Sequence, residues 1–309
     1  MKYILRSGII ITLLVALIQV ANAAEDELYF IDAHSQVDHT VVPLNKVISI
    51  MKQNGVSHTI LSARGKLTGK ELLAFASQYP EYISPAVRTK GGFYEAGSAK
   101  FYKAINTQVA SRKYSAMAEV LLYHAKKGNK APEVIVYPDD KRVQVALNYA
   151  IENGWPFVVH IEFASLHGED RKKFMRAFKQ VLDQHPEHPF IVTHLGQLSK
   201  EGCLRLIENH KNVYFHTGWT NPAAVESSNQ PWTNVFEGDR LDPEWKDIFV
   251  LYPNRFIFAL DNVFTEHWSD FYRKQMNYWK SGLAELPTDI AHLIAHGNAE
   301  NLWHIAPRN

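Results

Sequence analysis

The sequence predicts a single (βα)8 barrel, an α/β fold in which eight parallel strands alternate with helices. The main observation is a repeat of short apolar, β-branched or aromatic segments, which start about every 32 residues, close to the length of one βα unit. Segments with helical periodicity lie between several of them. No Gly-x-Gly-x-x-Gly motif follows the first predicted strand, which disfavours the structural alternative, a doubly wound dinucleotide-binding sheet.

Each predicted strand is a short run of residues that suit a buried parallel strand. The strands are residues 29–33, 58–63, 82–87, 117–122, 156–161, 189–193, 213–215 and 256–260. Predicted helices include residues 44–54, 68–79, 141–153, 169–184 and 200–210. Gly55 and Gly154 follow two of these helices, at a position where glycine commonly ends a helix.

The first 23 residues are interpreted as a signal peptide. Lys2 and Arg6 precede an almost wholly apolar run at 9–20, and Ala-Asn-Ala at 21–23 forms a small-x-small cleavage site. The apolar run is shorter than the ~20 residues of a membrane-spanning helix. We therefore expect an exported protein, periplasmic or secreted, with one domain at 24–309 and no stable membrane insertion after cleavage. An uncleaved anchor is the alternative.

The composition excludes several classes of protein. The formal net charge is +1, from 33 Lys+Arg against 32 Asp+Glu, and no basic cluster is present, which argues against nucleic-acid binding. The one cysteine, Cys203, excludes a disulfide framework within this sequence. The sequence contains 15 histidines, which suggests a site chemistry based on imidazole. The expected partner is a small-molecule substrate, and a homo-oligomer is left open.

Polar side chains stand at or near the carboxyl ends of all eight predicted strands. They are His34, Arg64, Arg88, Glu119, His160, His194, His216 and Asp261. These ends gather at one face of a barrel, where polar residues are typical of catalysis. A lone histidine beside a strand is more often a packing residue, but histidines and acids at the same point of a repeat are typical ligands of zinc, manganese or iron. For His216 alone, both interpretations stay open.

Five motifs occur in an order that resembles the amidohydrolase superfamily, in its amidohydrolase-2 branch of metal-dependent barrel hydrolases and decarboxylases. They are IDAH at 31–34, WPFVVH at 155–160, FIVTHLG at 190–196, FALD at 258–261 and GNA at 297–299. The resemblance extends from about residue 29 to residue 305, over nearly all of the expected mature chain. It implies an amidohydrolase-type TIM barrel and an enzyme with a bound metal.

The resemblance also implies roles for the matched residues. His34 and His160 would be metal ligands, and His194 would be a further ligand or a group that polarises the substrate. Asp261 would bind the metal and accept the proton of the attacking water. Glu119 lies where some relatives have a bridging carboxylate or a modified lysine. Its alternative role is that of a supporting acid at the edge of the packing.

The first motif departs from the family at Gln36, because the usual pattern is His-x-His. Residues two apart on a strand share a face, so His34 and Gln36 should still point to the same place. An amide oxygen donates less charge to a metal than an imidazole does. We therefore expect one divalent ion, zinc or manganese, bound less tightly than with the second histidine.

The expected reaction is metal-dependent hydrolysis, in which an activated water attacks an ester, lactone or amide carbonyl. Decarboxylation in the same site is less favoured. Two alternatives remain open, namely a ligand-binding barrel without catalysis and a metal-free lactonase that holds the carbonyl with Arg88. Elemental analysis would separate the metal enzyme from both.

Substrate binding is assigned to residues around the mouth of the barrel. The segment 217–242 carries Trp219 and lacks helical periodicity, which is typical of a lid or binding loop, although a surface loop packed on the barrel is the alternative. We expect Arg88 to hold an anionic group of the substrate, and Trp219 and Phe93 to contact an apolar or ring-shaped body. Gln36 and His216 are the remaining expected substrate contacts.

Overall fold

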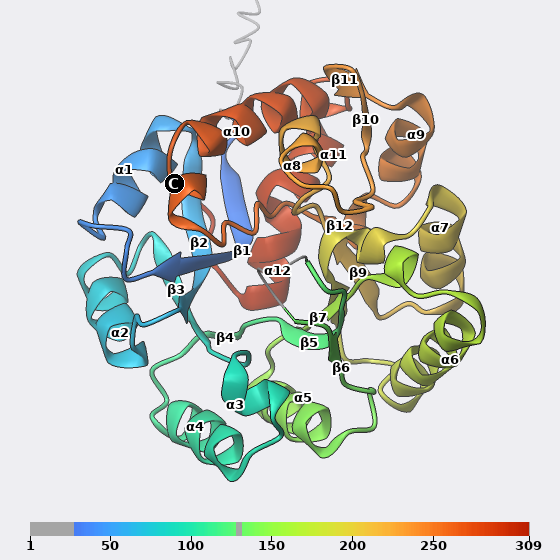
Figure 1. Ribbon diagram of the computed structural model, residues 1–309. Helices are drawn as coiled ribbons and strands as arrows, with labels where there is room; N and C mark the ends of the chain where they lie inside the picture. Colours follow the sequence, from blue (N-terminus) through green and yellow to red (C-terminus); the bar gives the residue numbers. More distant parts are fainter. Residues whose placement is uncertain (1–27, 128–131, 309) are drawn as a thin grey trace, which may run out of the picture.

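The computed structural model describes residues 28–127 and 132–308 of the 309-residue chain. The predicted signal peptide at 1–23 lies outside these ranges. Within them, no helix combines the length and the apolar character needed to cross a membrane. The described residues form one α/β barrel, with the helices arranged around a ring of strands (Figure 1).

Two arcs of mostly parallel strands build the ring. The first arc, in spatial order, is β1 (Phe30–Asp38), β2 (Val56–Arg64), β3 (Ile83–Val87) and β4 (Ala116–Met117). The second is β12 (Phe256–Ile257), β9 (Val213–His216), β8 (Phe190–Val192), β7 (Phe157–Ile161), β5 (Val120–His124) and the antiparallel β6 (Val134–Ile135). A separate hairpin consists of β10 (Phe236–Glu237) and β11 (Arg240–Leu241).

Backbone contacts join the two arcs. On one side, the chain passes directly from β4 to β5 through Ala118 and Glu119. On the other, the segment after β12 bonds to β1: the Ala33 N–H donates to the Phe258 carbonyl (3.1 Å) and the Asp261 N–H to the His34 carbonyl (2.8 Å). The second contact places the chain at Asp261 directly beside His34.

Most helices cover the outside of the ring, and α12 (Asn298–Trp303) lies across its middle (Figure 1). The longer ones are α1 (Lys46–Gln53), α2 (Gly69–Gln78), α4 (Ala99–Ala110), α5 (Lys141–Asn153), α6 (Gly168–Gln184), α7 (Lys200–Asn209), α9 (Pro243–Leu251) and α10 (Asp270–Leu283). Shorter ones are α3 (Gly92–Glu95), α8 (Pro222–Glu226), α11 (Thr288–His292) and α12 (Asn298–Trp303). Single turns are η1 (Phe163–Ser165), η2 (Thr193–Gln197), η3 (Pro253–Arg255), η4 (Thr265–His267) and η5 (Leu293–Gly297).

Local sequence explains the helix boundaries. In α5, Val143, Ala146, Leu147 and Ala150 are buried, and this spacing places them on one helical face. The Asp140 side chain accepts from the Arg142 N–H at the start of the helix. Gly154 ends it in the left-handed conformation, with φ 66°.

The core has two layers because strand residues alternate between the two faces of the ring. Large apolar side chains fill the outer layer between strands and helices. Smaller ones fill the inside: Ile31, Ala33, Ile60, Ala86, Ala116, Ala118, Val158, Ile191, Ile257 and Ala259, with Ala299 and Trp303 of α12. The Asn298 side chain donates to the Phe256 carbonyl, which ties α12 to the beginning of β12. The amino-terminal end of the barrel is thus packed mainly with apolar residues, and the large buried cluster of polar groups lies at the carboxyl end.

The eight strand positions predicted from the sequence are confirmed, but several bounds differ. β1, expected at 29–33, continues to Asp38, so His34 lies within it, and β12, expected at 256–260, ends at Ile257. The fourth, expected as one strand at 117–122, is divided into β4 and β5, and Ala118 and Glu119 lie between them. The segment 217–242, expected to lack regular structure, contains α8 and the β10–β11 hairpin. Pro222 begins α8 and the Asn221 side chain caps it, a local signal that periodicity over a longer window does not detect.

Candidate metal and catalytic centre

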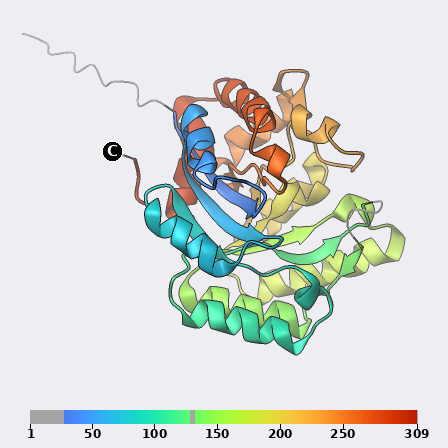
Figure 2. The same ribbon diagram turned by 60° about the vertical axis from the view of Figure 1, so that its left-hand side comes forward.

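The polar strand ends predicted from the sequence largely meet in one buried cluster. The blue and green strands point to one side of the molecule, away from the C-terminus (Figure 2). Side chains at that end belong to β1, the β4–β5 junction, β7, η2, β9 and the segment after β12. They are His34, Gln36, Glu119, His160, His194, His216 and Asp261, and each residue is at most 4% exposed.

Several residues of this centre have an unusual backbone conformation. His194, Trp219 and Asp261 have φ values of 55°, 60° and 50°, in the left-handed region. A residue other than glycine costs of order 1–3 kcal/mol there, and such strain clusters at functional sites. The turn after β8 also contains Gly196, where an added Cβ would lie 3.1 Å from Val192 Cγ1. The packing around these residues therefore holds their backbone in the left-handed conformation.

The two oxygens of Glu119 face different partners and divide the centre into two halves. We call the side of Oε1 the lysine half, because Lys90 Nζ forms an ion pair with this oxygen. Gln36 Nε2 donates to the same oxygen (3.4 Å) and to Asp261 Oδ1 (3.3 Å). His34 Nε2 lies 3.5 Å from Glu119 Oε1 and 3.3 Å from Asp261 Oδ1. This half is crowded with nitrogen donors.

We call the side of Oε2 the histidine half. His160 Nδ1 lies 3.0 Å from Glu119 Oε2, and the rings of His160 and His194 are 5.0 Å apart. His194 Nε2 lies 3.4 Å from Asp261 Oδ2. Glu119, His160 and His194 each offer one ligand atom, and these atoms lie within 4.8 Å of one another. The same spacing holds for His34, Glu119 and Asp261.

Hydrogen bonds outside the centre determine which ring nitrogens face it. His160 Nε2 contacts Glu162 Oε1 and Nδ1 contacts Glu119 Oε2, both at 3.0 Å, and since an ionised carboxylate only accepts, both nitrogens carry protons when no metal is bound. Burial lowers the pKa of His160, but the two carboxylates raise it above the ordinary value. His194 Nδ1 donates to the Gly218 carbonyl (3.0 Å), which leaves the Nε2 lone pair directed at the centre. Burial lowers the pKa of His194 to about 4, so its ring is neutral at neutral pH.

The carboxylates of the centre are ionised. Burial raises the pKa of Glu119, but Lys90, His34 and His160 together lower it well below its usual range. Burial and Glu119 raise the pKa of Asp261, and His34 and His194 overcome them and bring it below the ordinary value. Burial lowers the pKa of His34, but the two carboxylates raise it to about 10. Without a metal, His34 is therefore a cation at neutral pH.

His216 and Trp219 also belong to the centre. The His216 ring stacks on His34 at 5.5 Å, its Nδ1 accepts from the Gly218 N–H (3.1 Å), and its Nε2 is buried without a hydrogen-bond partner among the described residues. Trp219 Nε1 donates to the Asp261 carbonyl (3.1 Å). Trp219 is 9% exposed, so it supports Asp261 from within the packing.

The contacts of Arg88 and Phe93 lie elsewhere. Arg88 is partly buried and donates to the carbonyls of Gly65 (3.1 Å) and Lys90 (3.3 Å). Phe93 is 54% exposed on α3, and Lys100 Nζ lies 5.3 Å from its ring. Among the described residues, no contact connects Arg88 or Phe93 to the carboxylates of the centre.

Sequence reasoning missed four polar residues around the centre: Lys90 as the partner of Glu119, and His124, Lys127 and Glu162. Glu162 stands two residues after His160, so the alternation of side chains along a strand could have located it. Lys127 Nζ lies 2.8 Å from Glu162 Oε1 and 4.5 Å from the centre of the Trp232 ring. The Trp232 ring in turn lies 4.9 Å from that of His194.

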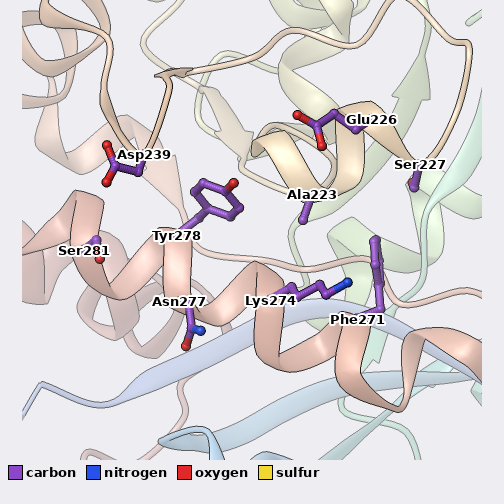
Figure 3. Close-up of a pocket in the computed structure, with 9 residues that line it drawn as sticks. All are labelled: Ala223, Glu226, Ser227, Asp239, Phe271, Lys274, Asn277, Tyr278 and Ser281. Atoms are coloured by element: carbon purple, nitrogen blue, oxygen red, sulfur yellow. The ribbon is translucent and has the colours of Figure 1, made fainter.

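A separate groove lies between α8 and α10 (Figure 3). It has a volume of about 660 Å³ and is lined by Ala223, Glu226, Ser227, Asp239, Phe271, Lys274, Asn277, Tyr278 and Ser281. None of the predicted site residues is among them. The groove mixes acidic, basic and neutral groups, and it does not include the buried centre.

The fold and the centre define a class of protein: a barrel enzyme with a carboxylate and imidazole cluster at the carboxyl ends of its strands. A family model described as "Amidohydrolase" matches residues 129–305, more than half of the chain, and the chain belongs to this family. It is an enzyme of the amidohydrolase-2 type. No curated protein matches the sequence.

Solved structures share the fold at low sequence identity. One is 5-carboxyvanillate decarboxylase from Sphingomonas paucimobilis, with 13% identity, a TM-score of 0.54, and coverage of 90% of this chain and 100% of that one. A second is 4-oxalomesaconate hydratase from Rhodopseudomonas palustris, with 13% identity, a TM-score of 0.54 and coverage of 89% and 96%. A third is an amidohydrolase from Burkholderia multivorans with bound zinc, with 11% identity, a TM-score of 0.50 and coverage of 90% and 100%.

Proposed function

We propose that this chain is an exported, metal-dependent hydrolase that cleaves an ester, lactone or amide bond in a small substrate with an anionic group. The cofactor is one divalent ion, zinc or manganese. The observation that carries the proposal is the donor set around Glu119, in which carboxylate oxygens and imidazole nitrogens lie within 4.8 Å of one another. Zinc and manganese favour such ligands.

The donor set fits a cation in the orientation of its rings as well as in its spacing. The outer hydrogen bonds of His160 and His194 leave Nδ1 of the first ring and Nε2 of the second facing the centre. Outer partners of this kind orient metal-binding histidines in proteins. A divalent ion held there would polarise a substrate carbonyl and acidify a water.

The residues of the chain supply the proton transfers. Asp261 is ionised, because its pKa lies below the ordinary range, so its carboxylate accepts a proton from the attacking water. It then passes the proton to the leaving group. His216 Nε2 carries a proton, since Nδ1 accepts from Gly218, and it donates to the oxygen that becomes negative as the carbonyl is attacked.

Trp232 and Lys127 are the candidates for holding the rest of the substrate. The Trp232 ring lies beside that of His194, and the Lys127 ammonium lies over the Trp232 ring. A planar body stacked on Trp232 would place its anionic group near Lys127. We assign these roles to Lys127 and Trp232, and not to Arg88 and Phe93, because the contacts of the latter pair lie away from the centre.

One observation favours a second candidate function, a metal-free lactonase. Lys90 and the protonated His34 already bring positive charge to the carboxylates. In that enzyme, these cations and His216 would stabilise the oxyanion, and Asp261 would still accept the proton of water.

Elemental analysis of the purified protein and a hydrolysis assay test the two candidates. The metal hydrolase should contain zinc or manganese, should lose its activity in chelator and should regain it when the metal is returned. Asp261→Ala should abolish turnover in either case. Full activity in chelator would contradict the metal hydrolase and support the lactonase, and unchanged turnover by Asp261→Ala would contradict the role of that residue in both.

A further inference from the structure

We propose that the ammonium group of Lys90 occupies the lysine half of this centre. Its positive charge then confines the divalent ion to the histidine half. This inference rests on the proposed metal-dependent function and goes beyond it. The ligands of the ion are then Glu119 Oε2, His160 Nδ1 and His194 Nε2. His34 and Gln36, the residues of the first motif, lie with Lys90 on the other side of Glu119.

The lysine half has little room for a second cation. Glu119 Oε1 already forms an ion pair with the Lys90 ammonium and accepts from Gln36 Nε2 (3.4 Å). The same Gln36 amide nitrogen donates to Asp261 Oδ1 (3.3 Å), so it lies between the two carboxylates. A divalent ion on Glu119 Oε1 would have to displace an ammonium group or lie beside it against charge repulsion.

The histidine half has two imidazole nitrogens and no protein ammonium group in contact with Glu119 Oε2 among the described residues. His160 Nδ1 lies 3.0 Å from this oxygen. A metal there would replace the proton of His160 Nδ1, and no ammonium group would have to move. His194 offers the lone pair of Nε2, since its Nδ1 donates to the Gly218 carbonyl. Two nitrogens and one oxygen leave further positions for water, as in catalytic zinc sites.

The position of Lys90 is secured by its neighbours. Arg88 Nε donates to the Lys90 carbonyl (3.3 Å), and the Thr89 hydroxyl donates to the Glu119 carbonyl. The loop after β3 therefore contacts both the backbone carbonyl and the side-chain carboxylate of Glu119. Arg88, expected from the sequence to bind the substrate, instead positions the lysine that meets the carboxylate.

Calorimetric zinc titration of the stripped full chain at pH 7.5 tests the proposal. The wild type should bind one equivalent and Lys90→Met should bind two, because removal of the ammonium frees Glu119 Oε1 for an ion with His34 and Asp261. Lys90→Arg keeps the charge and should return to one equivalent. The matched control is Lys127→Met, since Lys127 also pairs with a buried carboxylate and is as exposed as Lys90 (22% against 23%). It should bind one equivalent.

A second pair of variants locates the ion without changing Lys90. His194→Asn should weaken zinc binding by about 10–100-fold or more, the range seen when even supporting groups of a metal site are lost. His34→Asn should bind zinc at least as tightly as the wild type, because it removes no ligand and takes a positive charge away from Glu119. Circular dichroism and thermal unfolding of the stripped proteins establish that each variant folds, and the histidine pair decides the question if Lys90→Met does not fold.

The outcomes separate this inference from the proposed function. One equivalent in both wild type and Lys90→Met, two equivalents in wild type, or a loss of binding in His34→Asn but not in His194→Asn would each refute the role of Lys90. All three leave a metal-dependent hydrolase intact, although two equivalents in the wild type would change its cofactor from one ion to two. The absence of zinc and manganese binding in wild type would refute the proposed function and this inference with it.

Discussion

Glu162→Gln should weaken metal binding although Glu162 is not expected to touch the ion. Its carboxylate accepts hydrogen bonds from His160 Nε2 (3.0 Å) and the Ala125 N–H (2.8 Å) and forms an ion pair with Lys127 Nζ (2.8 Å). Burial raises the pKa of Glu162, but His160 and Lys127 bring it below the ordinary range, so it is ionised at neutral pH. The substitution keeps the size of the side chain and leaves one acceptor oxygen in place of two.

The expected magnitude follows from that loss. Whichever way the new amide turns, at least one of the three donors loses a good acceptor. If its NH2 group faces His160 Nε2, that nitrogen has to accept, and the ring proton moves to Nδ1, where it points at the metal position. Loss of such an outer partner weakens metal binding by about 10–100-fold, and a tenfold change is about 1.4 kcal/mol.

The assay is zinc competition against a chromogenic chelator, with ¹⁵N NMR of the histidine rings in the zinc-bound protein. The dissociation constant should rise, and the signals of His160 should change tautomer. The matched control is Glu169→Gln, an exposed acid paired with Lys172, which should leave both unchanged. Equal zinc affinity in Glu162→Gln and wild type would refute the role of Glu162 in orienting His160.

Three further predictions concern other parts of the chain. Glu119 and Asp261 raise the pKa of His34 from an ordinary value of 6.5 to about 10. The stripped protein should therefore lose stability as the pH rises from about 6.5 towards 10. In chemical denaturation, His34→Asn should show a smaller dependence of stability on pH over this range. Trp232→Ala should raise KM more for aryl esters than for methyl esters, and an equal change for both would contradict the stacking role. Mass spectrometry of the exported protein should find Ala24 or a near neighbour at the N-terminus, and an intact Met1 would contradict signal cleavage.

The strand order and the strand-end residues could be predicted because both depend on local spacing. Apolar runs that recur once per βα unit indicate a barrel, and a barrel brings the carboxyl ends of its strands together. His34, Glu119, His160, His194 and Asp261 therefore could be assigned to one centre before any geometry was known. Their mutual distances in the structure agree with that assignment.

The position of Lys90 at Glu119 could not be predicted from the sequence in this way. Lys90 lies in a loop after β3, and loop geometry has no sequence period. Its side chain reaches Glu119 because β4 and β5 are interrupted at that residue, an irregularity that propensity does not reveal. Arg88 directly follows a predicted strand, and the sequence likewise does not reveal that its guanidinium bonds to the nearby carbonyls of Gly65 and Lys90.

The left-handed backbone at His194, Trp219 and Asp261 sets a limit on attempts to make the enzyme more heat-tolerant. Glycine or asparagine adopts this conformation at lower cost than the residues present, so such replacements would relieve strain. They would also remove the proposed metal ligand, the indole donor to Asp261 or the proposed proton acceptor. Relief of strain at these three positions would therefore be coupled to loss of the proposed site. Stabilising substitutions should be sought on the outer helices and at the packed amino-terminal end of the barrel instead.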